Sequence, residues 1–150
     1  MKKLPPSAKI YEAYSAIADH RVHLDEGHAR VVSSNGSKEY RVTWKNDTYT
    51  SNDNATYWQG YAGYPVLAVL LLQGRLALDR DIMHYFRGID WTQLNATHKG
   101  DYNKAVAIVM RALQDRGIDG EAIEQAIDTV SKQIEGLSIE IKRGGDRPPK

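Results

Sequence analysis

The stretch from Thr48 to Leu76 reads TYTSNDNATYWQGYAGYPVLAVLLLQGRL and joins a polar, aromatic-rich loop directly to an apolar helix. Pro65 suits the first turn of a helix, because the N–H that proline lacks has no intrahelical partner there. Residues 66–72 are apolar without interruption, so this helix is expected to be buried on every side. The segment therefore predicts a central helix against which the rest of the chain packs.

Upstream of this segment, residues 28–44 predict a β-hairpin. Two β-prone runs flank Asn35-Gly36, and Asn-Gly is a strong hairpin signal because a type I′ turn needs positive φ at both central residues. Tyr40, Val42 and Trp44 alternate with polar residues, which is typical of a strand with one buried face. Residues 48–51 are expected to add another short strand.

The remaining chain predicts helices. One is expected to begin after Ser7 and to fade near Asp19–His20, with an inward face at Ile10, Tyr14, Ile17 and Ala18. Apolar residues also recur at helical spacing after residues 101 and 119. Alternation over residues 137–141 predicts a closing strand. Candidate N-caps are Ser7, Asp79 or Asp81, Asp101 and Asp119. The expected fold class is α+β: an N-terminal helix, a small antiparallel sheet with its hairpin at Asn35-Gly36, a buried central helix and a helical C-terminal half.

Composition and length predict one ordinary globular domain. Residues 1–141 are expected to form it, with a soft internal boundary near residue 79, and the basic, Gly- and Pro-rich residues 142–150 predict a disordered tail. The formal net charge is +1, and cysteine is absent. The longest apolar run has eight residues, whereas a membrane span needs about 20. The N-terminal lysines resemble the start of a signal peptide, but the apolar segment of a signal peptide does not follow them. We therefore expect a cytoplasmic location and no membrane partner.

Reaction-specific motifs are missing from the sequence. It contains no G-x-S-x-G elbow, no phosphate loop and no H-E-x-x-H. His20, His23 and His28 lie near carboxylates that could help them to hold a metal ion, but on a strand the odd spacing of His20 and His23 sends their side chains to opposite faces. We therefore expect no catalytic residue, metal or cofactor. A small-molecule enzyme with a site at these histidines or at His84 stays as an alternative.

The aromatic loop before the central helix is the main candidate for binding. Its rings can stack on a ligand while its amides donate and accept directional hydrogen bonds. The same residues could instead cover the core, because Asn and Asp form local turns. The candidate binding residues of the loop are Asn52, Asn54, Tyr57, Trp58, Gln59, Tyr61 and Tyr64. A second candidate surface, the wet face of the hairpin, carries Arg30, Lys38, Arg41 and Lys45 and could contact phosphates, with Arg30, Arg41 and Lys45 as its candidate binding residues.

Residues 39–72 resemble a SWIM-type zinc finger. YRVTW resembles its second strand, YTSND stands where that family has C-x-C-P-D, and GYPVLAVLLL stands where it has C-K-H followed by an apolar helix. This places Tyr49, Ser51, Gly63 and Pro65 on the four ligand positions and Asp53 on the aspartate. The resemblance implies a strand–strand–helix scaffold without its metal, in which a buried aromatic cluster replaces the stabilisation that zinc supplies.

These observations favour a non-enzymatic binding module over an enzyme. Its aromatic loop is expected to contact a protein partner or a second copy of the chain. The resemblance implies contact with protein or nucleic acid and nothing narrower. Binding of nucleic acid through the basic hairpin face is the first alternative, and the histidine-containing enzyme is the second.

Overall fold

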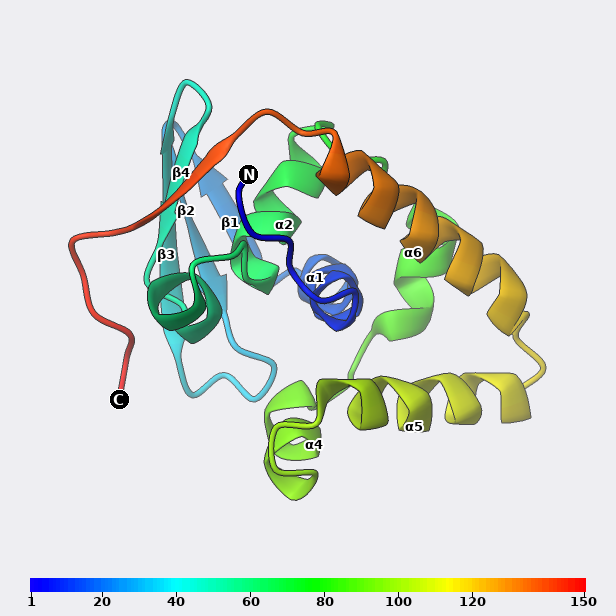
Figure 1. Ribbon diagram of the computed structural model, residues 1–150. Coiled ribbons are helices and arrows are strands. Elements are labelled where there is room, and N and C mark those ends of the chain that lie inside the picture. The colour runs from blue at the N-terminus through cyan, green and yellow to red at the C-terminus, as the bar shows by residue number, and fades with distance from the viewer.

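The fold is a five-stranded sheet with helices packed on one of its faces (Figure 1). The structure is a computed structural model that describes residues 1–150. The strands lie in the sheet in the order of the sequence. They are β1 (Val22–Asp25), β2 (His28–Val32), β3 (Glu39–Lys45), β4 (Thr48–Ser51) and β5 (Glu140–Arg143). The predicted α+β class, with its helical C-terminal half, is confirmed.

The last strand departs from the expected antiparallel sheet. Strands β1 to β4 pair antiparallel, but β5 pairs parallel to β4, with Tyr49 opposite Ile141. A parallel pair needs a long crossover connection, and the helical half of the chain supplies it. The strand also begins later than the alternation suggested and continues to Arg143, into the segment expected to be a tail.

The helices begin directly after the residues that were predicted to cap them. They are α1 (Ala8–Ala18), the π-helical turn η1 (Ala55–Gln59), α2 (Tyr64–Leu72), α3 (Arg80–Met83), the 3₁₀ turn η2 (His84–Phe86), α4 (Trp91–Thr97), α5 (Tyr102–Asp115) and α6 (Gly120–Glu135). The side chains of Asp79, Asp101 and Asp119 each accept a hydrogen bond from a first-turn N–H. Asp79, and not Asp81, caps α3. Ser7 occupies the N-cap of α1 without a side-chain bond.

The hairpin between β2 and β3 is present, but its turn differs from the type I′ expectation. The strands end at Val32 and resume at Glu39, so residues 33–38 form a longer loop. Gly36 has φ +76° and Asn35 does not share the positive φ. The Asn35 side chain holds the loop instead, because its Oδ1 accepts from Ser33 Oγ and from the N–H and hydroxyl of Ser37. Asn-Gly therefore predicted the position of the hairpin correctly. The loop is stabilised by the Asn35 side chain and not by the type I′ backbone conformation.

Helices α1 and α2 form the centre of the molecule. Residues 65–71 of α2 are all buried, as the apolar run predicted. The one-sided burial predicted for α1 is wrong, because all of its residues are buried against neighbours that include α2, α3, α5, α6 and η2. In Figure 1 this helix is seen nearly end-on, with other elements around it. Burial on every side also removes Lys9 and Glu12 from solvent.

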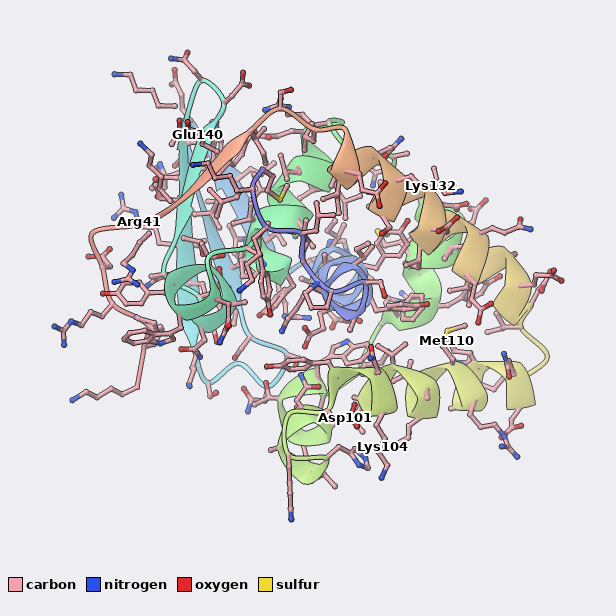
Figure 2. All side chains as sticks on the ribbon, viewed as in Figure 1. Arg41, Asp101, Lys104, Met110, Lys132 and Glu140 are labelled. Atoms are coloured by element: carbon pink, nitrogen blue, oxygen red, sulfur yellow. The ribbon has the colours of Figure 1, made fainter.

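Helices α5 and α6 cover the core with amphipathic faces. The inward positions predicted for α6, from Ile123 to Ile134, are buried. In α5, Met110 lies on the side that faces α6, whereas Lys104 on α5 and Lys132 on α6 point outward (Figure 2). No helix combines the length and the apolar character that crossing a membrane requires.

Candidate functional site

The aromatic loop is anchored by one buried carboxylate, that of Asp53. Ser51 Oγ donates to Asp53 Oδ1, and the backbone N–H of Thr56 donates to Oδ2 over 3.1 Å. Thr56 Oγ1 in turn accepts from the N–H of Gly63 over 3.0 Å. This chain of bonds connects the end of β4, the first turn of η1 and the start of α2. It fixes the loop from the inside.

Gly63 is required by the same carboxylate. Its φ of −71° is open to any residue, so backbone strain does not demand glycine. A Cβ at this position would lie 2.7 Å from Asp53 Cγ and closer still to Oδ2. Since Asp53 is short, buried and hydrogen bonded on both oxygens, it has little room to move aside. Gly63 therefore provides the space that the anchor fills.

Two of the four positions aligned with SWIM metal ligands belong to this anchor. Ser51 and Gly63 are joined through Asp53 and Thr56. The third position, Tyr49, donates its hydroxyl to Gln73 Oε1 over 2.6 Å. The strand–strand–helix order that the resemblance implied is present in β3, β4 and α2. No group of three or more His, Cys, Asp or Glu side chains is placed to hold a metal ion.

The candidate binding residues of the loop separate into an inner and an outer set. Trp58 is 61% exposed and Tyr61 only 9%. Asn54 and Gln59 are exposed, whereas Asn52, Tyr57 and Tyr64 are half-buried. The loop thus covers the core and also presents a surface, but Trp58 is the one ring of that surface that is mostly exposed. Contact with a protein partner or with a second copy of the chain stays a prediction, and it now depends on Trp58.

Trp58 is held at the surface by its neighbours. The Tyr57 ring meets it edge-on at 4.6 Å between centroids, and the Arg143 guanidinium lies 4.4 Å from the Tyr57 centroid. Arg143 also donates to the Tyr57 carbonyl, and Lys3 donates to the Gln59 carbonyl over 2.8 Å. Segments from both ends of the chain therefore fasten the outer side of η1.

Three of the four basic residues expected on the hairpin, Arg30, Arg41 and Lys45, lie together on the uncovered sheet face, whereas Lys38 lines a separate cavity with Tyr40. Arg30 and Arg41 are direct cross-strand partners, and all three side chains, including Lys45, are exposed. Arg30 forms an ion pair with Glu39 at 2.7 Å. Arg41 and Lys45 take part in none of the ion pairs of the protein.

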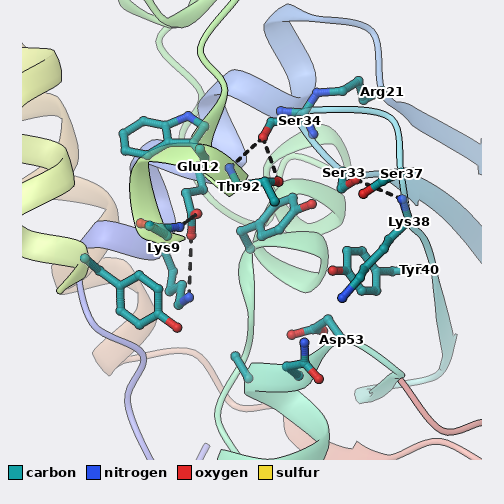
Figure 3. Close-up of a pocket in the computed structure, with 16 residues that line it drawn as sticks. Lys9, Glu12, Arg21, Ser33, Ser34, Ser37, Lys38, Tyr40, Asp53 and Thr92 are labelled. Carbon is teal, nitrogen blue, oxygen red and sulfur yellow. Dashed lines mark hydrogen bonds and ion pairs between the residues drawn. The ribbon is translucent and has the colours of Figure 1, made fainter. Parts of the chain in front are cut away.

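A polar cavity of about 220 Å³ lies between α1, the loop of residues 33–38, the start of η1 and α4 (Figure 3). We call it the Glu12 cavity. Of the residues that the sequence put forward for binding, Asn54 and Tyr64 of the loop and Lys38 of the hairpin line it. Its wall is held together by Ser34, whose Oγ accepts the N–H of Thr92 over 3.0 Å and so ties the hairpin loop to α4.

A buried ion pair forms one wall of the Glu12 cavity. Lys9 Nζ lies 3.5 Å from Glu12 Oε2, and the two side chains are 7% and 8% exposed. The Lys9 ammonium also lies 3.7 Å from the centroid of the Tyr102 ring. Asn95 Nδ2 donates to Glu12 Oε1 over 2.8 Å. Glu12 Oε2 and Asn95 Oδ1 are buried and have no hydrogen-bond partner in the protein.

Tyrosines form the opposite wall. The rings of Tyr40 and Tyr64 meet edge-on at 6.2 Å between centroids. Burial raises the pKa of both phenols, and each is raised further by nearby charge or by the other ring: Tyr40 by Asp53 and Glu12, Tyr64 chiefly by Tyr40. Both hydroxyls are therefore protonated at neutral pH and can donate hydrogen bonds.

Sequence reasoning missed Lys9 and Glu12, because one-sided burial of this helix left them out of its inward face. A polar i, i+3 pair in a helix whose other residues are alanine, tyrosine, isoleucine and one serine was the available signal. The histidines contribute nothing to the Glu12 cavity. His28 lies in a separate depression with Arg30 and Arg41, and neither His20, His23 nor His84 lines either one.

Comparison with known proteins identifies a family. Residues 2–140 match the family described as "Uncharacterised conserved protein UCP014422", and the chain belongs to that family. No curated protein and no solved structure matches the chain. The matching family is not that of SWIM zinc fingers.

The anchor predicts a non-additive pair of substitutions. Gly63→Ala should lower the free energy of unfolding by about 2–4 kcal/mol, because the new methyl group overlaps the Asp53 carboxylate. Asp53→Ala should cost a similar amount through lost hydrogen bonds. The double variant should be more stable than the sum of the two single costs predicts, since the methyl group added at position 63 then occupies vacated space. A double-mutant cycle from urea unfolding measures this coupling, and strict additivity would contradict the overlap.

The buried phenols predict loss of stability in alkali. Because burial raises the pKa of Tyr64 above its ordinary value of about 10, its contribution is complete below pH 10 and is lost as the pH rises above it. Between about pH 10 and pH 11.5 the unfolding free energy of Tyr64→Phe should decrease less with pH than that of the wild type. Urea titrations at several pH values measure the effect. The control Tyr85→Phe, on an exposed ring, should leave the pH profile as in the wild type.

Proposed function

We propose that the protein is a binding module whose Glu12 cavity takes a small hydroxylated ligand. The observation that carries the proposal is the pair of buried oxygens Glu12 Oε2 and Asn95 Oδ1, neither of which accepts a hydrogen bond within the protein. Glu12 Oε2 has only the Lys9 ammonium beside it, at 3.5 Å. Leaving a buried acceptor unsatisfied costs about 1–3 kcal/mol, and more for a charged group. A ligand with adjacent hydroxyl groups would donate to both.

The buried ion pair supports the same proposal. Replacing a buried ion pair by neutral groups of similar size is often neutral or stabilising, so stability gives no reason to keep Lys9 and Glu12 inside α1. Groups that are costly to bury and that line a cavity are candidates for ligand recognition. The rings of Trp91 and Tyr102 also line the cavity and offer apolar surface beside the acceptors. A volume of about 220 Å³ suits a metabolite-sized molecule.

The double variant Lys9→Met/Glu12→Gln tests this function. The glutamine side chain keeps an acceptor for Asn95, so the unfolding free energy should stay within about 1 kcal/mol of the wild type or rise. Ligand-observed NMR with a library of polyols, sugars, sugar acids and nucleosides should find binders for the wild type and none for the variant. A bound ligand at 100 times its dissociation constant should stabilise the wild type by about 2.7 kcal/mol.

A matched control separates binding from general effects of charge removal. Lys132→Met/Asp128→Asn removes an exposed pair on α6 with a 3.0 Å separation, far from the cavity lining, and should change neither binding nor stability appreciably. If Lys9→Met/Glu12→Gln instead unfolds at far lower denaturant and the library yields no binder to the wild type, the pair serves the fold and the proposal is wrong.

A second candidate function is nucleic-acid binding on the uncovered sheet face. It is favoured by one observation, the direct cross-strand pairing of Arg30 with Arg41. Like charges directly opposite one another destabilise a sheet, and Glu39 compensates only Arg30. Phosphate groups would compensate Arg41 and Lys45, which have no ion-pair partner.

The salt dependence of binding tests the second candidate. Fluorescence anisotropy with a labelled single-stranded oligonucleotide should show binding at low salt, with an affinity that falls as salt increases. Arg41→Ser/Lys45→Ser should weaken binding and lower the salt slope by roughly 2. Lys104→Ser/Lys132→Ser, on the helical half, is the control with the same change of net charge. Absence of binding in about 20 mM salt, or equal loss in both double variants, would remove this candidate.

A further inference from the structure

The wall of the Glu12 cavity opposite Glu12 offers hydrogen-bond donors. Tyr64 lines this wall, and because burial raises the pKa of its phenol, the hydroxyl keeps its proton and can donate a hydrogen bond. Tyr40 carries a second protonated hydroxyl on the same wall. Lys38 lines the cavity and takes part in none of the ion pairs of the protein. Figure 3 shows Lys38 beside Tyr40.

The helix wall offers acceptors, and the two walls are therefore complementary in kind. Glu12 Oε2, with only Lys9 beside it at 3.5 Å, and Asn95 Oδ1 can accept hydrogen bonds, whereas Tyr40, Tyr64 and Lys38 can donate them. A ligand that satisfies both walls must carry acceptor atoms at one end and donor groups at the other. A simple hydrocarbon or a purely cationic amine would leave one wall without partners.

The charges on each wall limit which chemical groups the two ends of the ligand can carry. Glu12 is already neutralised by Lys9 at 3.5 Å, so an added ammonium group would meet Lys9 as a like charge, and a neutral hydroxyl fits better. On the other wall Arg21 is paired with Asp19 at 3.4 Å, which leaves Lys38 as the cation without a partner. Lys38 favours a group with a negative charge, and Asp53 in the same lining opposes more than one such charge.

Asp53 argues against a doubly charged group on that wall. It lies in the cavity lining near Tyr40, and its oxygens are already hydrogen bonded by Ser51 and Thr56. Its own charge would repel a phosphate dianion more strongly than a carboxylate. A carboxylate also presents two acceptor oxygens, which match the separate donors on this wall.

We propose that the ligand of the Glu12 cavity is a hydroxylated carboxylic acid, with its carboxylate on Lys38, Tyr40 and Tyr64 and its hydroxyl groups on Glu12 and Asn95. This rests on the proposed function, and it adds the charge and the orientation of the ligand. The donor wall selects the acid, and the acceptor wall selects the hydroxyl groups.

Three matched probes test the two ends separately by isothermal titration calorimetry on the full chain. Gluconate carries a carboxylate on a polyhydroxylated chain, glucitol has a hydroxymethyl group in place of the carboxylate, and 2-amino-2-deoxygluconate has an ammonium group in place of one hydroxyl. Gluconate should bind at least roughly tenfold more tightly than glucitol, because hydrogen bonds to charged groups are the stronger ones. It should also bind more tightly than the amino analogue. Glucose 6-phosphate serves as the dianionic comparison and should bind more weakly than gluconate.

Two variants assign the effect to the donor wall. Lys38→Met should weaken gluconate binding by roughly tenfold and leave glucitol binding unchanged. Lys132→Met, on the outer side of α6, should alter neither. Tyr64→Phe is the second variant, and it should weaken gluconate binding with the ring packing retained, which a near-ultraviolet circular dichroism spectrum checks.

The outcomes distinguish this inference from the proposed function. If glucitol binds as tightly as gluconate and Lys38→Met changes neither, the cavity takes polyols without selecting an acid, and the inference is wrong while the proposed function stands. Tighter binding of the phosphate ester would overturn the charge assignment alone. If none of the probes binds the wild type, the inference is wrong, and the metabolite library with Lys9→Met/Glu12→Gln decides the proposed function separately.

Discussion

The bonds to the Asp53 carboxylate are the interaction on which the arrangement of the loop, the sheet and the central helix depends. Three backbone segments that have no regular hydrogen bonds with one another, namely the end of β4, the turn η1 and the start of α2, meet at this one side chain. Buried polar groups are tolerated where each partner is satisfied, and here both carboxylate oxygens are. The anchor sets the direction in which α2 enters the core. It also places Asn54 and Tyr64 on the wall of the Glu12 cavity.

The Glu12 cavity forms where the two parts of the molecule meet. The sheet side contributes the loop of residues 33–38, and the helical side contributes α4, joined to that loop through Ser34 and Thr92. Two hydrogen bonds fix the position of Trp91: its indole N–H donates to Ser15 Oγ over 2.7 Å, and Ser15 Oγ donates to the Phe86 carbonyl. The side chains that line the cavity are therefore fixed by contacts with buried residues behind them. A site built on rigid elements can be selective without first reorganising.

The sequence predicted most of the local structure because local chemistry determines it. The Asp residues at the helix starts, Pro65 and the alternation in β3 act within a few residues of their own positions. The parallel pairing of β5 and the burial of α1 on every side depend on contacts between distant segments, which no local pattern records. The same holds for the site. Asn54 and Tyr64 were found through the composition of their loop, whereas Lys9 and Glu12 had the appearance of surface residues until the packing around α1 enclosed them. Trp58 and Tyr61 are three residues apart, yet Trp58 is exposed and Tyr61 is buried. The composition of the loop alone does not show which of its rings faces solvent.

The parallel pairing of β4 with β5 also bears on how the chain reaches this fold. When β4 leaves the ribosome its outer edge has no partner, and it stays open until the whole helical half has been synthesised and β5 follows. Pairings between distant segments form slowly because the loop between them must close first. An open strand edge is a site for pairing with another chain. The β4 sequence Thr-Tyr-Thr-Ser is mostly polar, so the edge that is open before β5 is made is a poor target for another chain and stays available for its own strand.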